Sequence, residues 1–270
     1  MNLLYCVDYH VLGIFLCSLR SIVLHGGYEH YNVYVLHSCF DEKMEAAINH
    51  DFKGIMTFHF IRVSDTLFTE FPETDRYPKE IYYRLAAPFL LPEDLSRVLY
   101  LDTDTIVINS LQELYETDFE GHCYAGCTHI RKLLTKINQI RLKSEKAEAY
   151  VNTGVLMMNL PVLRDTVNMQ EISEYVHEHM ESMILPDQDI LAALYGDKIK
   201  LLDTLRYNLS DRMLNIHNTA HPHHKINLPW IRENTVVIHY CGRNKPWKDG
   251  YIGELGVFYK EFAPKYNLPL

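Results

Sequence analysis

Residues 97–108 read RVLYLDTDTIVI, so two aspartates, Asp102 and Asp104, stand between two apolar runs. The residues on both sides favour a buried strand, in which Asp is one of the least favoured residue types. Because side chains alternate along a strand, these two carboxylates are expected to point the same way and lie side by side. Adjacent carboxylates repel each other unless a cation sits between them. The stretch therefore predicts a site for Mg²⁺ or Mn²⁺, although a turn with two solvated aspartates fits the spacing equally well.

The composition describes a soluble globular protein, and the length is normal for a single large α/β enzyme domain. The chain has 270 residues, and 47% of them are hydrophobic, which is enough for a sizeable core. The net charge of −9 argues against nucleic acid as a partner, because phosphate binding needs a basic face. No signal peptide or membrane span is expected. The six cysteines are scattered in apolar surroundings, which is typical of buried thiols in a reducing compartment, so a cytoplasmic location is predicted.

Strand and helix patterns alternate in the first part of the chain. Strands are expected over 3–7, 32–37 and 55–63, and helices over 11–25, 41–52 and 79–90. This alternation predicts an α/β fold in three layers around a largely parallel sheet. Such sheets bind ligands at the carboxyl ends of their strands, where Asp8 and the pair Asp102 and Asp104 would lie.

The later patterns are more mixed. Strands are expected over 122–128, 150–160, 198–202 and 235–239, a helical segment or lid over 130–149, and a helix over 161–180. Four histidines fall within 217–224, where the intervening residues predict a solvent-exposed loop. Zinc ligand types also occur at His122, Cys123, Cys127 and His129, but without the spacing of a zinc knuckle. A packed core strand is the favoured interpretation there.

Several polar residues elsewhere have both a structural and a functional interpretation. Asp187-Gln188-Asp189 opens a helix, and for this run alone a simple N-cap is the favoured interpretation. Arg84, on the helix over 79–90, is explained as well by a surface salt bridge as by a binding site.

The segment that follows the last strand carries further candidates. His239 ends that strand and could complete an octahedral metal site with the two aspartates. Gly242 lets the backbone approach a ligand closely, and Lys245 supplies a cation for phosphate.

Taken in order, these blocks resemble the family 8 retaining glycosyltransferases, which include bacterial lipopolysaccharide galactosyltransferases and glycogenin. The matching blocks are the opening strand to Asp8, Tyr83-Arg84, Leu101-Asp102-Thr103-Asp104, Asn152-Thr153-Gly154-Val155, Asp187-Gln188-Asp189-Ile190-Leu191 and the segment 239–247.

The resemblance implies a GT-A-like, Rossmann-like three-layer fold with a mixed, mostly parallel sheet. It implies one glycosyltransferase domain over 1–270, with a C-terminal lid and tail from about residue 239. The implied activity is a retaining transfer of a hexose, galactose or glucose, from a UDP-sugar to a hydroxyl of a saccharide, lipid-linked or protein-linked acceptor. The oligomeric state and a weak association with a membrane surface stay open.

The resemblance also implies roles for individual residues. Mn²⁺, or alternatively Mg²⁺, would be held by Asp102, Asp104 and His239, and the diphosphate oxygens by Gly242 and Lys245. The uridine would face Cys6 and Asp8. The sugar would be bound by Arg84, Asn152, Asp187 and Gln188, of which Asp187 and Gln188 are the catalytic candidates.

Two details qualify the resemblance. The family often has Asn two residues after its first Asp, where this chain has His10. A double displacement needs a nucleophile under the anomeric carbon, but only Gln188 matches the expected place, and an amide is a poor nucleophile. Attack of the acceptor on the same face as the leaving phosphate is therefore the favoured mechanism.

Two other classes compete with a glycosyltransferase. In a haloacid-dehalogenase-like phosphatase, Asp102 would be the nucleophile and Asp104 the acid. That motif normally lies near the start of its domain, whereas many strand and helix units precede it here. A non-catalytic sugar-nucleotide-binding protein would tolerate the loss of metal and phosphate ligands, yet Asp102, Asp104, His239 and Lys245 are all present.

Overall fold

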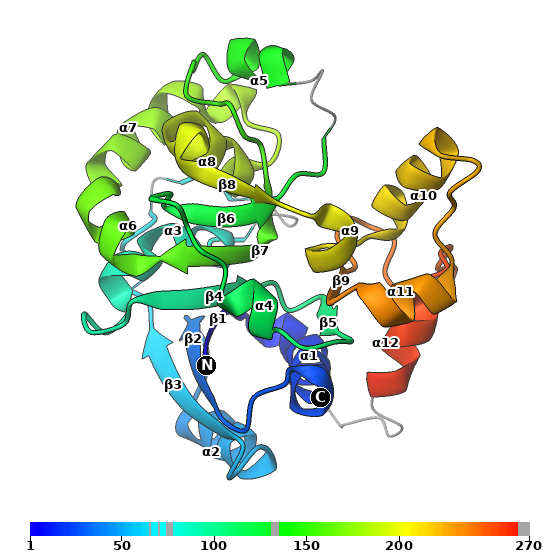
Figure 1. The fold of residues 1–270 in the computed structure, drawn as a ribbon. Coiled ribbons are helices and arrows are strands. Elements are labelled where there is room, and N and C mark those ends of the chain that lie inside the picture. The colour runs from blue at the N-terminus through cyan, green and yellow to red at the C-terminus, as the bar shows by residue number, and fades with distance from the viewer. Residues whose placement is uncertain (65, 70, 74–77, 131–134, 264–270) are drawn as a thin grey trace.

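The computed structural model of the chain describes residues 1–64, 66–69, 71–73, 78–130 and 135–263. Its centre is a seven-stranded sheet with the strand order β3-β2-β1-β4-β7-β6-β8 (Figure 1). The strands are β1 (Asn2–Cys6), β2 (Tyr31–His37), β3 (Met56–Arg62), β4 (Arg97–Leu101), β6 (Tyr124–Cys127), β7 (Asn152–Asn159) and β8 (Ile199–Leu202).

The pairing of the strands decides which residues meet at the edge that carries the site. The strands β1 to β4 run parallel, whereas β7 is antiparallel to both β4 and β6, and β8 is parallel to β6. The sheet is therefore mixed and mostly parallel, as predicted. Because β7 runs the opposite way, its first residues lie beside the last residues of β4, with Val155 opposite Leu101. The block 152–154 thus meets the block 102–104 in space.

Helices cover both faces of the sheet. The helices are α1 (Leu12–His25), α2 (Glu42–Asp51), α3 (Glu80–Leu90), α4 (Gln112–Tyr115), α5 (Thr135–Arg141), α6 (Leu160–Thr166), α7 (Met169–His179), α8 (Pro186–Tyr195), α9 (Thr204–Tyr207), α10 (Asp211–Ala220), α11 (Leu228–Asn234) and α12 (Gly256–Phe262). One apolar core joins α3, α6, α7 and α8 to Leu4 of β1, and another joins α1, α2 and α4 to Leu3 and Tyr5. This alternation along β1 produces the predicted three layers.

A second, two-stranded sheet was not anticipated. It pairs β5 (Thr105–Val107) antiparallel with β9 (Val237–His239). A third apolar core gathers β5 and β9 with α10, α11 and α12, which Figure 1 shows beside one end of the main sheet. The small sheet joins the middle of the chain to its C-terminal part.

The expectation that Asp102 and Asp104 share one face of a strand is wrong. The chain leaves β4 at Leu101 and turns before β5, with the amide and the hydroxyl of Thr105 donating to the Asp102 carbonyl at 3.2 and 2.8 Å. Asp and Thr side chains compete for local backbone bonds, which favours such a turn. The alternative, a turn with two solvated aspartates, is right about the turn, but the two side chains are only 28% and 16% exposed.

Three other boundaries differ from expectation. The helix over 161–180 is two helices, because Asn168 caps α7 by accepting from the amides of Gln170 and Glu171. The histidine loop over 217–224 begins inside α10, which continues to Ala220. The segment 130–149 was expected to be exposed, but its residues Leu142, Ala147 and Ala149 are buried. Residues 131–134 of this segment lie outside the described part of the chain.

The six cysteines are all free thiols, and none forms a disulfide. Of the helices that the described residues form, none has the length and apolar character needed to cross a bilayer. The last part of the predicted tail, residues 264–270, lies outside the described residues.

Candidate metal and donor site

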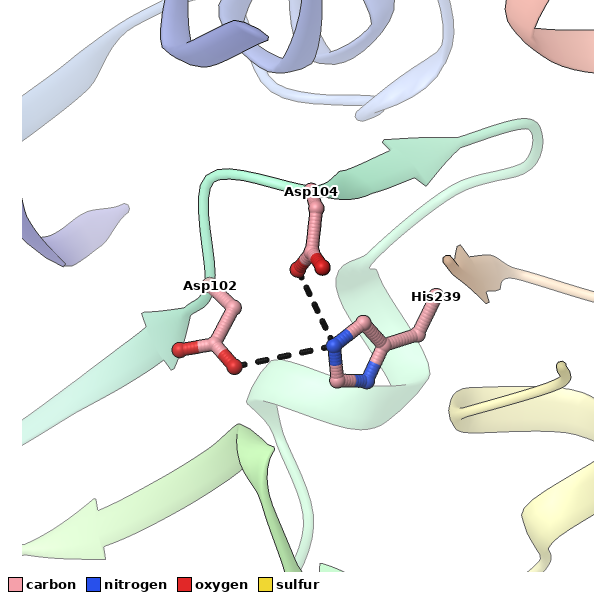
Figure 2. Close-up of side chains that lie close together, drawn as sticks. All are labelled: Asp102, Asp104 and His239. Carbon is pink, nitrogen blue, oxygen red and sulfur yellow. Dashed lines mark ion pairs between the residues drawn. The ribbon is translucent and has the colours of Figure 1, made fainter. Parts of the chain in front are cut away.

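Three potential metal ligands converge at the carboxyl end of β4. The ligand atoms of Asp102, Asp104 and His239 all lie within 4.8 Å of one another (Figure 2). His239 Nε2 is 3.0 Å from Asp104 Oδ1 and 3.6 Å from Asp102 Oδ2. The small sheet brings the histidine here, because β9 pairs with β5 so that His239 stands opposite Thr105. Among the described residues, no other group of three or more His, Cys, Asp or Glu gathers in this way, so the zinc interpretation of residues 122–129 has no support.

The donor set fits a hard divalent cation. Two carboxylates and one imidazole suit Mn²⁺ or Mg²⁺ better than a soft metal. Gly154 leaves the space that these ligands need: a Cβ there would lie 2.5 Å from Asp102 Oδ2 and closer still to the His239 ring. Its carbonyl also accepts from the Asp102 amide at 2.7 Å. The Asn-Thr-Gly block therefore has a structural reason for its glycine.

Lys245 lies directly against this cluster. Its Nζ is 2.5 Å from Asp104 Oδ2 and 2.7 Å from the Tyr240 carbonyl oxygen. Burial opposes ionisation of Asp104, but His239 and Lys245 outweigh it and hold the pKa of Asp104 well below its usual value. In the structure, Lys245 thus neutralises a carboxylate that the sequence assigned to the metal.

Arg84 connects the cluster to the start of α8. The side chain is 5% exposed, and its NH2 lies 3.0 Å from Asp102 Oδ1 while NH1 lies 3.3 Å from Asp187 Oδ2. NH1 also donates to the Thr153 carbonyl at 3.0 Å, and the guanidinium stacks over the Tyr100 ring. A surface salt bridge is therefore the wrong interpretation of this arginine. Burial raises the pKa of Asp187, and Arg84 acts in the opposite direction.

The three residues of the Asp187-Gln188-Asp189 run have different surroundings. Asp187 accepts from Thr153 Oγ1 at 2.5 Å. Gln188 is half-buried, and its side chain makes no hydrogen bond with any described residue. Asp189 is fully buried; its partners are Arg141 at 2.6 and 2.9 Å, Tyr150 at 2.8 Å, and the Ile184 and Leu185 amides. The N-cap interpretation is wrong, because the N-cap of α8 is Leu185 without a side-chain bond. Asp189 instead accepts hydrogen bonds from the backbone amides of Ile184 and Leu185, just before the helix.

Asn152 and Asn208 form a buried pair behind His239. Asn152 Oδ1 accepts from Asn208 Nδ2 at 3.0 Å, and Asn208 Oδ1 lies 3.0 Å from His239 Nδ1. Sequence reasoning selected Asn152 but missed Asn208, because a single Asn after a short helix has no spacing signal of its own. Only the fold reveals that Asn208 contacts a candidate ligand.

The remaining candidates lie around this centre. Cys6 ends β1, and burial raises the pKa of its thiol to about 12, so it stays protonated. Asp8 accepts from the His10 amide at 2.6 Å and caps the short turn Tyr9–Val11. Gly242 is exposed with φ of 91°, a left-handed conformation that favours glycine.

A cavity of about 530 Å³ adjoins the cluster on the side of α10 and shares His239 with it. Its lining also includes Asp211 and Arg212. Asp211, the first residue of α10, is bonded to the segment before α12: it accepts from the Tyr251 hydroxyl and from the Glu254 and Leu255 amides. Arg212 forms no ion pair with any described residue. The lining therefore combines one carboxylate with one guanidinium.

Known proteins resemble this chain in sequence and in fold. The sequence model of Glycosyl transferase family 8 matches residues 2–250. General stress protein A of Bacillus subtilis is 25% identical, over 70% of this chain and 66% of its own length. Lipopolysaccharide 1,2-glucosyltransferase of Escherichia coli strain K12 is 23% identical, over 96% of this chain and 76% of its own. The structure of the galactosyltransferase LgtC with donor and acceptor sugar analogues has a TM-score of 0.79 and 26% identity, covering 97% of this chain and 95% of that one.

Proposed function

The chain belongs to glycosyl transferase family 8, and on that premise we propose that it transfers galactose or glucose from a UDP-sugar to a hydroxyl acceptor with retention of configuration. The convergence of Asp102, Asp104 and His239 beside Lys245 and Arg84 carries the proposal, because it joins carboxylates that suit a cation to cations that suit a diphosphate. We propose that the acceptor is a saccharide, free or linked to lipid or protein. It would approach through the cavity that shares His239 with the cluster. A single domain with a C-terminal lid, and a cytoplasmic location, remain predictions.

The chemistry requires that negative charge be stabilised on the leaving group. Breaking the bond between the anomeric carbon and the phosphate oxygen leaves an oxocarbenium-like sugar and a UDP anion. When bound at Asp102, Asp104 and His239, Mn²⁺ or Mg²⁺ would supply a Lewis acid for the diphosphate oxygens. Lys245 would add a second positive charge at the same oxygens, with Gly242 admitting them close to the backbone. The uridine would lie toward Cys6 and Asp8.

The residues around the sugar favour orientation over covalent catalysis. The acceptor oxygen would bond to the anomeric carbon on the face that the phosphate leaves, and its proton would pass to a departing phosphate oxygen. Asp187 is tied to Arg84 and Thr153, so it would position the sugar rather than attack it. The Gln188 side chain and Asn152 Nδ2, neither of which has a hydrogen-bond partner among the described residues, are available to contact the sugar.

The rival classes explain less of this geometry. A phosphatase would need Asp102 as a free nucleophile, yet its Oδ1 accepts from Tyr100 at 2.7 Å and pairs with Arg84 at 3.0 Å. A binding protein without catalysis would tolerate the loss of Lys245, which here lies 2.5 Å from Asp104. Membership of the family also favours the transferase.

Binding of UDP in the presence and absence of metal tests the proposal. We expect calorimetry to show weak UDP binding in EDTA and tighter binding with Mn²⁺, together with a higher melting temperature. Asp104→Asn should remove most of this metal dependence. Asp51→Asn is the control, because Asp51 is an exposed residue of α2 at the far edge of the sheet (Figure 1). Equal UDP affinity with Mn²⁺ and with EDTA would contradict the metal assignment.

The reaction class has its own measurement. With Mn²⁺, we expect slow release of UDP from UDP-galactose or UDP-glucose, water taking the place of the acceptor. The faster of the two donors identifies the sugar. Release of phosphate from phosphate esters without turnover of any UDP-sugar would favour the phosphatase instead.

A further inference from the structure

A buried line of hydrogen bonds runs from the backbone of Gly154 to His239. The Gly154 amide donates to Asn152 Oδ1 at 3.2 Å, Asn208 Nδ2 donates to the same oxygen at 3.0 Å, and Asn208 Oδ1 lies 3.0 Å from His239 Nδ1. Asn152 is 8%, Asn208 0% and His239 1% exposed. Because water has little access, each of these polar atoms needs a partner of opposite polarity.

The direction of every bond in this line follows from one backbone group. The Gly154 N–H can only donate, so the atom of Asn152 that faces it must be the carbonyl oxygen. That oxygen also faces the amide of Asn208, which must therefore present its NH₂ group. The other end of the same amide, turned toward His239, is then its carbonyl oxygen. An oxygen can only accept, so in the neutral imidazole Nδ1 must carry the hydrogen.

We propose that Asn208 is a positioning residue that keeps a hydrogen on Nδ1 of His239 and so reserves Nε2 for a metal held with Asp102 and Asp104. The inference rests on the proposed metal site. Nε2 is 3.0 Å from Asp104 Oδ1, so the opposite tautomer would donate a hydrogen to that carboxylate and occupy both ligands. Nδ1 donates to Asn208 in the imidazolium as well as in this neutral tautomer, so Nε2 is in both cases the nitrogen that a cation between the carboxylates can take, once it displaces any Nε2 hydrogen. These hydrogen bonds thereby fix which ring nitrogen of His239 can bind a metal.

The fold holds Asn208 in place independently of this contact. The backbone amide of Asn208 donates to the Thr204 carbonyl at 3.2 Å, and the backbone carbonyl oxygen of Asn208 lies 2.9 Å from His129 Nε2. The next residue, Leu209, donates to Val237 of β9 at 3.0 Å. The backbone of Asn208 is therefore fixed to the strand that carries His239, and its side chain has little freedom to choose another partner. Orientation of a ligand histidine by such an outer partner is common in metal sites.

The tautomer can be measured directly in the wild-type protein. Nitrogen-15 NMR of the metal-free chain distinguishes a protonated ring nitrogen from one with a lone pair, and His239→Gln identifies the signals of this residue. We expect a hydrogen on Nδ1, with Nε2 either bare in the neutral ring or also protonated in the imidazolium. A neutral ring with its hydrogen on Nε2 would overturn the inference.

Variants test whether Asn208 matters for the metal. Asn208→Ala should weaken Mn²⁺ binding by about 10- to 100-fold, the usual effect of losing an outer partner, and should let both tautomers appear in the metal-free spectrum. Asn208→Asp, of nearly the same size, should keep the hydrogen on Nδ1, because its carboxylate still accepts there. Asn218→Ala is the matched control, because both amide atoms of Asn218 bond to the Ile226 backbone, outside the site.

The outcomes separate this inference from the proposed function. Unchanged Mn²⁺ affinity and tautomer in Asn208→Ala would overturn the positioning role alone. A similar loss of Mn²⁺ affinity in Asn218→Ala would assign the effect to stability and also overturn it. Failure of the wild-type protein to bind Mn²⁺ with or without UDP would instead overturn the metal site itself, and the proposed function with it.

Discussion

Gly154 is the residue on which the packing of the metal cluster depends. Its α-carbon lies so close to Asp102 and His239 that no side chain fits between them. A methyl group there would have to displace a ligand or the end of β7. Since β7 is buried from Asn152 to Met158, the strand has little room to yield.

We therefore expect Gly154→Ala to damage the site more than the fold. Mn²⁺ affinity and UDP release should both fall at least about tenfold, because a displacement of about 1 Å is costly in a preorganised site. Gly13→Ala is the control: Gly13 lies on α1 with open space around it, and the change should leave the site intact and raise stability by up to about 1 kcal/mol. Calorimetric Mn²⁺ titration and thermal unfolding measure the two effects. Wild-type Mn²⁺ affinity in Gly154→Ala would contradict the packing argument.

The site residues differ in how well their roles could be read from the sequence. Asp102, Asp104 and His239 were recognisable because carboxylates and histidine are unusual at the ends of apolar strands. Arg84 was ambiguous, because a charged residue on a helix is usually solvated, and only burial excludes a surface role. Asn208 could not be selected, since its importance comes from the atoms it contacts rather than from its position along the chain.

At the level of elements, α8 divides its two aspartates between two tasks. Asp189 is enclosed by Arg141, Tyr150 and backbone amides and secures the chain before the helix. Asp187, two residues earlier, pairs with Arg84, which also pairs with Asp102. Residues two apart on a helix point in different directions, so one turn can serve both.

This division predicts opposite effects for two similar substitutions. Asp189→Asn should lower the free energy of unfolding by about 3 kcal/mol, because it leaves the Arg141 charge without its buried partner. Asp187→Asn should change stability less, since burial already disfavours this carboxylate, but should lower transfer at least about tenfold by releasing Arg84. Thermal unfolding and UDP-release rates of both variants distinguish the roles, each variant serving as the control for the other. Equal stability of the two variants would contradict the assignment.

Element boundaries were the weakest part of the sequence-based prediction. The alternation of strands and helices and a largely parallel sheet were readable from periodicity, whereas the mixed sheet was implied by the resemblance to the family. The turn at residues 102–104 was not, because the apolar residues on both sides make it look like one continuous strand. The two aspartates nevertheless lie close together, because the turn brings their side chains to the same place. The pairing of β5 with β9 then adds His239 to them. The division between α6 and α7 had a readable signal in Asn168, a residue favoured at the N-cap.

At the scale of the whole molecule, the segment after β9 connects the site to the third apolar core. Trp247 packs against the rings of Tyr240 and Tyr259, with ring centroids 6.4 and 5.2 Å apart. Lys245 Nζ lies 5.3 Å from the centre of the Trp247 ring while it pairs with Asp104. The indole thus senses a cation whose position depends on whether Asp104 has another partner.

Ligand binding should therefore change the fluorescence of Trp247. A metal at Asp104 competes with Lys245 for the carboxylate, and the diphosphate of UDP offers Lys245 a new anionic partner, so the two ligands together should draw the ammonium away from the ring. The protein has two tryptophans, so Trp230→Phe isolates the signal. We expect a clear change with UDP and Mn²⁺ and much less with either alone. Lys245→Met in the same background is the control and should abolish the response while leaving the fold intact. Constant emission at saturating UDP and Mn²⁺ would show that Trp247 and the cation beside it stay fixed when the site is filled.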